Sequence, residues 1–138
     1  HNFFSQFDWW KFSKIDHSID KQIRIPYIDP YNGKRNFLPD FVFWLQKEKQ
    51  YHILYIDPKG TGRNEYQYKV DGYRDLFVEN NKVKEFIFGN KKLKVHLRLA
   101  TEDTGVFGDK DYYKKYWIRS NDFNIKYRYL GFTSFSFG

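Results

Sequence analysis

Cysteine and methionine are both missing from this sequence of 138 residues. Without cysteine the chain cannot form disulfides, bind zinc through thiolates or use a thiol nucleophile, which fits a protein of the bacterial cytoplasm. Long apolar runs are missing as well: no stretch approaches the roughly 18 residues that a membrane-spanning helix needs, and no secretory leader is recognisable. Because the chain starts at His1 and lacks methionine, we expect a fragment of a larger protein.

Several catalytic patterns are also absent. No glycine-rich phosphate loop occurs, the four histidines show no metal-ligand spacing, and nothing in the sequence indicates a hydrolytic Ser-His-Asp triad, whose members converge from distant positions. No repeat, low-complexity segment or linker divides the chain, and its length suffices for one hydrophobic core. We therefore expect a single domain over residues 1–138.

A surplus of positive charge is the first feature that points to a partner. The 24 lysines and arginines outnumber the 17 acids, which leaves a net charge of +7. Such a surface attracts polyanions, and DNA is the partner that we expect. Aromatic residues make up 22% of the chain, and although most of these rings should build the core, an exposed minority can stack on bases.

Residues 37–60 form the most informative stretch, FLPDFVFWLQKEKQYHILYIDPKG. Two hydrophobic strands are joined by a polar turn, and each strand carries an acid: Asp40 follows Pro39, and Asp57 stands two residues before Lys59. If the strands pair antiparallel, Asp40 lies across from the 57–59 end, so two carboxylates and an ammonium meet at one place. Ionised carboxylates rarely sit so close together unless a cation holds them.

Periodicity predicts the other elements. Apolar residues at helical spacing predict a helix over 3–15, and alternation predicts a strand over 22–28. A second helix is expected over 65–78, and the clearest alternating strand covers 91–100, with a lysine-rich row directed outward.

The acidic pattern resembles a known nuclease motif. A Pro-Asp pair followed seventeen residues later by Asp-x-Lys is similar to the PD-(D/E)xK motif of restriction endonuclease-like folds. The longer run IRIPYIDPYNGKRNFLPDFVFW…YIDPKG resembles the endonuclease domain of type III restriction enzymes and related helicase-like proteins. The resemblance implies an α/β fold with a restriction endonuclease-like core: a helix, a three-stranded antiparallel meander, a second helix and further strands, in a mixed sheet flanked by helices.

The same resemblance implies a chemistry. Asp40 and Asp57, with the Pro58 backbone carbonyl, would bind Mg²⁺ or Mn²⁺ and hydrolyse DNA phosphodiester bonds, and both acids would be catalytic. Lys59 would position the attacking water or offset charge on the phosphate. The implied partners are DNA, an upstream ATPase or helicase-like domain or subunit, and a modification subunit.

A further acid for a second metal is less evident. The first helix of such nucleases commonly supplies a glutamate, but this chain has no glutamate before Glu48. Asp16 is the first candidate to replace it, ahead of Asp8, Asp20 and Asp29. Each of these four can equally be a solvated or helix-capping aspartate.

Basic residues near the motif are candidates for holding the phosphate backbone. One pair follows the turn at 29–33, and two more lie on the predicted helix 65–78, although solvent-exposed roles explain each of them as well. The four candidates are Lys34, Arg35, Lys69 and Arg74.

Two other functions stay open. The missing glutamate favours a basic nucleic-acid-binding module whose nuclease site has degenerated. A plain interaction domain would instead use Asp40 and Asp57 as turn residues only.

Overall fold

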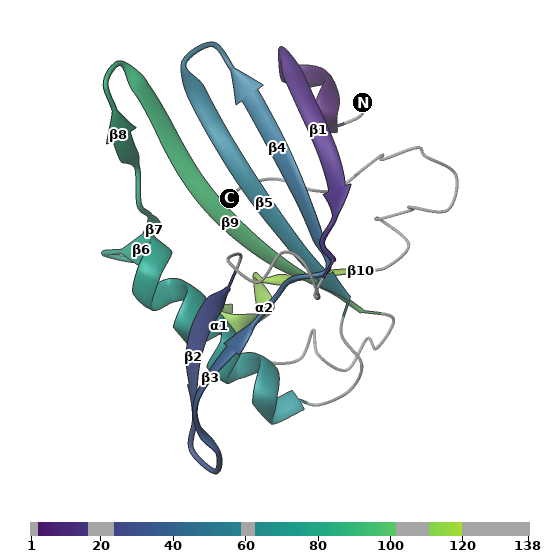
Figure 1. Ribbon diagram of the computed structural model, residues 1–138, viewed down its shortest axis with the longest axis vertical. Helices are drawn as coiled ribbons and strands as arrows, with labels where there is room; N and C mark the ends of the chain where they lie inside the picture. The colour runs from purple at the N-terminus through teal and green to yellow at the C-terminus, as the bar shows by residue number, and fades with distance from the viewer. Residues whose placement is uncertain (1–2, 17–23, 59–62, 102–110, 120–138) are drawn as a thin grey trace.

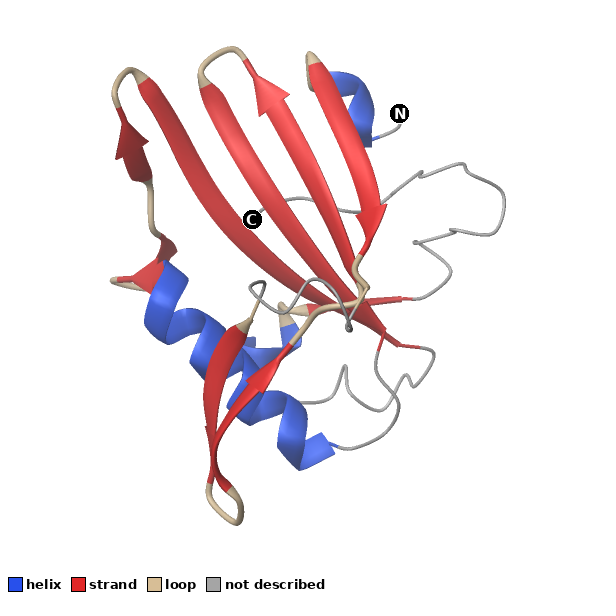
Figure 2. Cartoon of the chain, in the orientation of Figure 1, coloured by secondary structure: helices blue, strands red, loops and turns tan. Residues whose placement is uncertain are grey.

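The protein is described by a computed structural model that covers residues 3–16, 24–58, 63–101 and 111–119. Strands predominate in it (Figures 1 and 2). A six-stranded mixed sheet has the order β1-β4-β5-β9-β10, and β8 also pairs with β9. Its strands are β1 (Trp9–Lys14), β4 (Phe41–Lys47), β5 (Gln50–Pro58), β8 (Phe86–Phe88), β9 (Lys91–Thr101) and β10 (Trp117–Arg119).

Smaller elements surround this sheet. They are the 3₁₀-helix η1 (Phe3–Gln6), the hairpin of β2 (Ile25–Asp29) and β3 (Gly33–Phe37), helix α1 (Arg63–Phe77), the hairpin of β6 (Val78–Glu79) and β7 (Lys82–Val83), and helix α2 (Asp111–Lys114). Within the described ranges, neither helix is long and apolar enough to cross a membrane.

The two strands expected within 37–60 are confirmed. β4 and β5 pair antiparallel from Phe41 opposite Ile56 to Lys47 opposite Gln50, and Glu48 takes a positive φ of 54° in the tight turn between them. Helix α1 and strand β9 also lie where the sequence predicts them, and β9 runs parallel to β5 after the helical connection.

The helix predicted over 3–15 is wrong. Only the four residues of η1 are helical there, and β1 instead pairs antiparallel with β4 at the edge of the sheet. Phe4 stacks on both Trp10 and Phe43, with ring centroids 4.8 Å apart for Phe4–Trp10 and 5.1 Å apart for Phe4–Phe43. Phe4 buries its ring from η1, whereas Trp10 contacts that ring from β1 and stays 40% exposed, since large rings also suit a pleated surface.

The predicted restriction endonuclease-like α/β core is wrong as well. The fold is mostly β: among the described residues, α1 lies on one face of the sheet and the short η1 packs on the other, so long helices do not flank both faces there. The strand expected over 22–28 does not join the main sheet: β2 pairs with β3 in a separate hairpin, and β1 takes the third place beside β4 and β5.

Alternation along the strands creates two hydrophobic cores, one on each face. On the α1 face, Val95, Leu97 and Leu99 of β9 pack with Tyr66, Val70 and Tyr73 of the helix. On the opposite face, Phe41, Phe43, Leu54 and Ile56 pack with Phe4 of η1. Both faces of the sheet are buried near its centre, so only part of the lysine-rich row of β9 faces solvent. His96, within that row, is only 2% exposed.

Helix α1 approaches the β2–β3 hairpin most closely at Gly72. A Cβ added there would overlap the Pro26 carbonyl oxygen and lie 2.7 Å from Tyr27 Cβ. The hairpin can rest against the helix because this position lacks a side chain (Figure 1).

We expect Gly72→Ala to destabilise the protein by about 1–3 kcal/mol, because overlap with a backbone oxygen outweighs the better helix propensity of alanine. Thermal melts measure the change. Asp75→Ala, an exposed substitution on the same helix, is the matched control and should shift stability by no more than about 0.5 kcal/mol. A Gly72→Ala protein as stable as the parent would contradict the close contact.

Two histidines meet on the face opposite α1. His52 Nδ1 and His96 Nε2 lie 2.9 Å apart, so one neutral ring donates a hydrogen bond to the other. Burial lowers the pKa of both imidazoles, and the nearby Lys94 ammonium lowers each pKa further. The pair is therefore neutral in the folded protein at pH 7.

Acid should destabilise the fold through this pair. The unfolded chain takes up protons below about pH 6.5, whereas the folded pair, with its lowered pKa values, does not, so stability falls as the pH drops from 7 to 5. For His96 alone this amounts to about 2 kcal/mol at pH 5. Melting temperatures of the parent and of His96→Leu at both pH values test this. The variant should lose fewer degrees on acidification, and equal losses would show that the pair does not resist protonation.

Candidate carboxylate site at the end of the central strands

The register of β4 and β5 puts the two predicted acids at the same end of the sheet. The ladder ends where Phe41 lies opposite Ile56; Asp40 precedes Phe41 in a bend, and Asp57 follows Ile56 within β5. Side chains alternate along β5, so Asp57 lies on the same face as Ile53 and Tyr55, which is the α1 face. Asp40 and Asp57 are called the carboxylate pair below.

The two members of the carboxylate pair differ in exposure. Asp57 is only 5% exposed and stands within β5, where it also pairs with Leu99 of the parallel strand β9. Asp40 is partly exposed and stands in a bend before β4, where its backbone carbonyl accepts a hydrogen bond of 2.7 Å from the Ile15 N–H. The site thus has one buried carboxylate and one that solvent can reach.

Asp16 lies beside the exposed member of the pair. Lys14, Ile15, Asp16 and Asp40 line an open hollow of about 630 Å³ where β1 ends against β4. Asp16 itself is exposed. The structure therefore places Asp16, the candidate for a further metal ligand, next to Asp40, whereas Asp57 does not line this hollow.

The remaining residues predicted for the site lie elsewhere or have other contacts. Lys59 lies outside the described residues, whereas Pro58 ends β5, and its backbone is thus adjacent to Asp57. Two of the other early aspartates have local roles: Asp8 accepts a 2.6 Å hydrogen bond from the Glu48 N–H, and Asp29 accepts bonds from residues of its own turn. Those hydrogen bonds lower the pKa of the Asp29 carboxyl group. Asp20 lies outside the described residues.

The described residues contain no group of three histidine, cysteine, aspartate or glutamate side chains placed to hold a metal ion. Two carboxylates at the same end of the sheet and a backbone carbonyl are nevertheless a hard oxygen donor set. Mg²⁺ commonly binds through one or two carboxylates and completes its shell with waters and substrate phosphates. The chemistry of the carboxylate pair therefore suits Mg²⁺, with Asp57 held rigidly by its strand.

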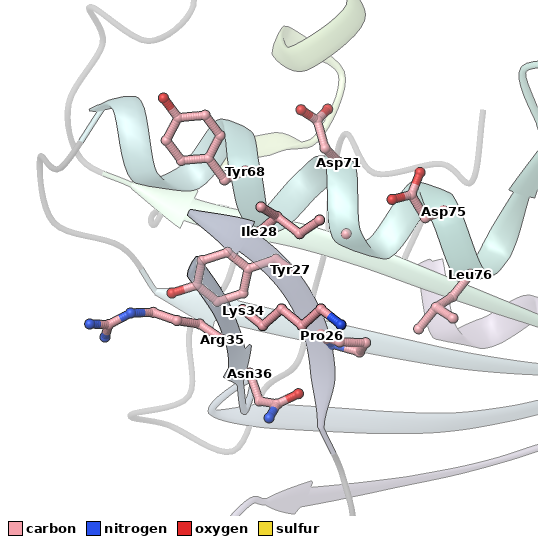
Figure 3. Close-up of a pocket in the computed structure, with 11 residues that line it drawn as sticks. Pro26, Tyr27, Ile28, Lys34, Arg35, Asn36, Tyr68, Asp71, Asp75 and Leu76 are labelled. Atoms are coloured by element: carbon pink, nitrogen blue, oxygen red, sulfur yellow. The ribbon is translucent and has the colours of Figure 1, made fainter. Parts of the chain in front are cut away.

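Lys34 and Arg35, predicted to hold phosphate, are exposed on β3. They line a groove of about 560 Å³ between the hairpin and α1, whose helical wall carries Asp71 and Asp75 (Figure 3). Because acids and bases share this groove, it offers a polyanion less attraction than the lysine and arginine alone would suggest.

The two basic residues predicted on α1 take part in packing. Lys69 is only 5% exposed, and its ammonium lies 5.4 Å from the centre of the Phe37 ring, so it does not reach the surface as predicted. Arg74 donates hydrogen bonds to Tyr116 Oη at 2.8 Å and Asn81 Oδ1 at 2.9 Å. Both cations thus stabilise contacts between α1 and its neighbours, which spacing along a helix cannot reveal.

The structure has an exposed aromatic surface that the sequence did not indicate. Exposed rings gather at the turn end of the sheet, around an apolar hollow beside Trp9, Trp44 and Phe88. The high aromatic content was its only signal in the sequence, because pairing of distant strands decides which rings share a face.

Fold and site together define the class of this protein: it is mostly β and carries two acids at the end of its central strands. The chain belongs to the YagJ family, whose model matches residues 2–106. No match was found among curated proteins or among solved structures. The family match covers both members of the carboxylate pair and names no activity for them.

Thermal melts should reveal whether the carboxylate pair binds a cation. In chelator we expect Asp57→Asn to melt above the parent, because the substitution removes one of two negative charges at the same end of the sheet. Free Mg²⁺ at ten times its Kd should stabilise the parent by about 1.4 kcal/mol, a shift of a few degrees, and the variant by less. Asp75→Asn, which changes an exposed carboxylate, should behave as the parent does. Melts that Mg²⁺ leaves unmoved in all three proteins would contradict a cation site.

Proposed function

We propose that this protein is a Mg²⁺-dependent nuclease that hydrolyses DNA phosphodiester bonds at the carboxylate pair, with Mn²⁺ as an alternative cation. The observation that carries the proposal is the register of β4 and β5, which puts buried Asp57 and partly exposed Asp40 at the same end of two central strands. Carboxylate oxygens are the hard ligands that Mg²⁺ prefers. The proposal rests on this pair and on the net charge of +7, and not on any particular nuclease fold.

The chain's own groups have distinct tasks in this proposal. A cation bound here would supply a water of lowered pKa and neutralise charge on the phosphate. Asp57, whose backbone is held by β9, would bind the cation from the buried strand. Asp40 would bind it where solvent has access, and the hollow shared with Asp16 would leave room for a phosphate. Lys59, two residues after Asp57, offsets negative charge as the phosphate is attacked.

Partners and setting follow from this activity. DNA is the substrate, and we place the protein in the bacterial cytoplasm where DNA is found. The upstream ATPase or helicase-like partner and the modification subunit remain predictions from the resemblance to type III restriction enzymes.

A second function is nucleic-acid binding without cleavage. It is favoured by the lack of a three-ligand metal cluster among the described residues and by the exposed rings at the other end of the sheet. The two functions differ in whether the carboxylate pair is needed for anything beyond folding.

Cleavage of supercoiled plasmid in Mg²⁺, and in parallel in Mn²⁺, separates these functions. Asp40→Asn and Asp57→Asn should each lower the cleavage rate about 100-fold or more, as expected when a charge-stabilising group is removed, while DNA binding in chelator persists. Lys59→Ala should have a similar effect. Asp75→Asn serves as the control and should cut as the parent does.

Two results would contradict the proposal. Equal cleavage by the parent and both pair variants would assign the activity to other residues or to a contaminant. A parent that binds DNA but cuts no faster in Mg²⁺ than in chelator would favour the binding module.

A further inference from the structure

Among the described residues, only one end of the α1 face of the main sheet is covered. Helix α1, the β2–β3 hairpin and α2 gather over one end of the sheet, whereas the strands extend beyond them toward the turns at 47–50 and 88–91 (Figure 1). At this uncovered end lies an apolar hollow of about 370 Å³. We call it the aromatic hollow; its lining is led by Trp9, Trp44, Tyr51, Phe88, Lys91 and Leu93.

Strand register explains why these rings share one face. Trp9 lies opposite Gln46, Gln46 opposite Tyr51, and Tyr51 beside Leu93, so one row of side chains crosses four strands. Phe88 pairs with Lys91 and so joins the same face from β8. Trp9 is 49% exposed and Phe88 is 62% exposed, which leaves the faces of both rings open to a ligand.

The charged residues that line the aromatic hollow are lysines. The Lys91 ammonium lies 5.6 Å from the centre of the Tyr51 ring. Lys92 also borders the hollow, but it pairs with Ile87 of the opposite face and its ammonium lies 3.4 Å from a Glu85 carboxylate oxygen. Lys11 is exposed and pairs with Trp44, which places it on the same face. None of the lining residues is acidic, in contrast to the groove beside α1. A ligand that offers flat apolar rings and negative charge together would match this surface.

We propose that the aromatic hollow binds single-stranded nucleic acid, whose bases stack on Trp9 and Phe88 while the lysines contact its phosphates. Every base has a face for stacking, so binding of this kind tolerates many sequences and depends strongly on salt. A duplex hides its bases and cannot use the rings in this way. An apolar protein segment would fill the hollow but would not require a rim of lysines.

This site is separate from the carboxylate pair. Tyr51 and Asp57 stand at opposite ends of β5, six residues and thus roughly 20 Å apart. Binding at the aromatic hollow shares the ligand class of the proposed nuclease but does not rest on cleavage, and it should persist without metal.

Fluorescence anisotropy with a labelled oligothymidylate, in chelator and low salt, tests the proposal. Phe88→Ala and Trp9→Ala should each weaken binding roughly 5- to 100-fold, the range found when one stacking ring is removed. Phe88→Trp should bind as the parent does, whereas Phe88→Leu, which keeps the apolar character but loses the ring, should weaken binding as alanine does. Circular dichroism and melts verify that each variant is folded.

The chain supplies a matched control for Phe88. Ile87 is 68% exposed on the same strand, but it pairs with Lys92 and so points to the opposite face. Ile87→Ala should therefore leave affinity unchanged, and Asp57→Asn should do the same because the carboxylate pair is distant. Retained binding by Asp57→Asn distinguishes this site from the nuclease proposal, since either can fail while the other stands.

Four outcomes would overturn the proposal. The first is the absence of measurable binding by the parent at low salt. A loss as large for Ile87→Ala as for Phe88→Ala would show a general effect of surface apolarity. Full affinity of Phe88→Leu would indicate apolar docking, as for a protein partner, and equal competition by a duplex would exclude stacking.

Discussion

The antiparallel pairing of β4 with β5 is the constraint on which the rest of the structure depends. Its register decides which residues of both strands face α1 and which face η1, and a slip of one residue would exchange the two sets. The core on the η1 face is built on these two strands, whereas the core on the α1 face is built mainly on β9 and α1, and β1 and β9 extend the sheet on either side. The tight turn and the strand ends then create the two candidate sites.

The carboxylate pair shows how such a framework concentrates charge. Burying a carboxylate costs several kcal/mol unless it is paired and hydrogen-bonded, so an aspartate in a central strand is rarely neutral for stability. The backbone of Asp57 is held in place by the ladder between β5 and β9. A cation site at this point would use the stiffness of the sheet to hold one ligand in place, while Asp40 and Asp16 lie where solvent and substrate have access.

The opposite end of the sheet illustrates a different use of the same alternation. Where no described element covers the strands, rows of side chains that would otherwise be core become a surface of rings bordered by lysines. The lining of this hollow contains lysines and no acid, whereas the other end of the sheet carries Asp40 and Asp57. In the two proposals the first end binds a polyanion and the second end cleaves it, with the length of β5 between them.

Local pattern determined much of this protein by itself. Alternation and a short polar turn predicted β4, β5 and β9, and helical spacing predicted α1. The sequence could not decide that residues 9–14 form a strand, that β2 leaves the main sheet, that Lys69 and His96 are buried, or that Trp9 and Phe88 share a face. Those outcomes depend on which distant segments pair and cover one another, because burial and cross-strand contact are tertiary properties that override local preference.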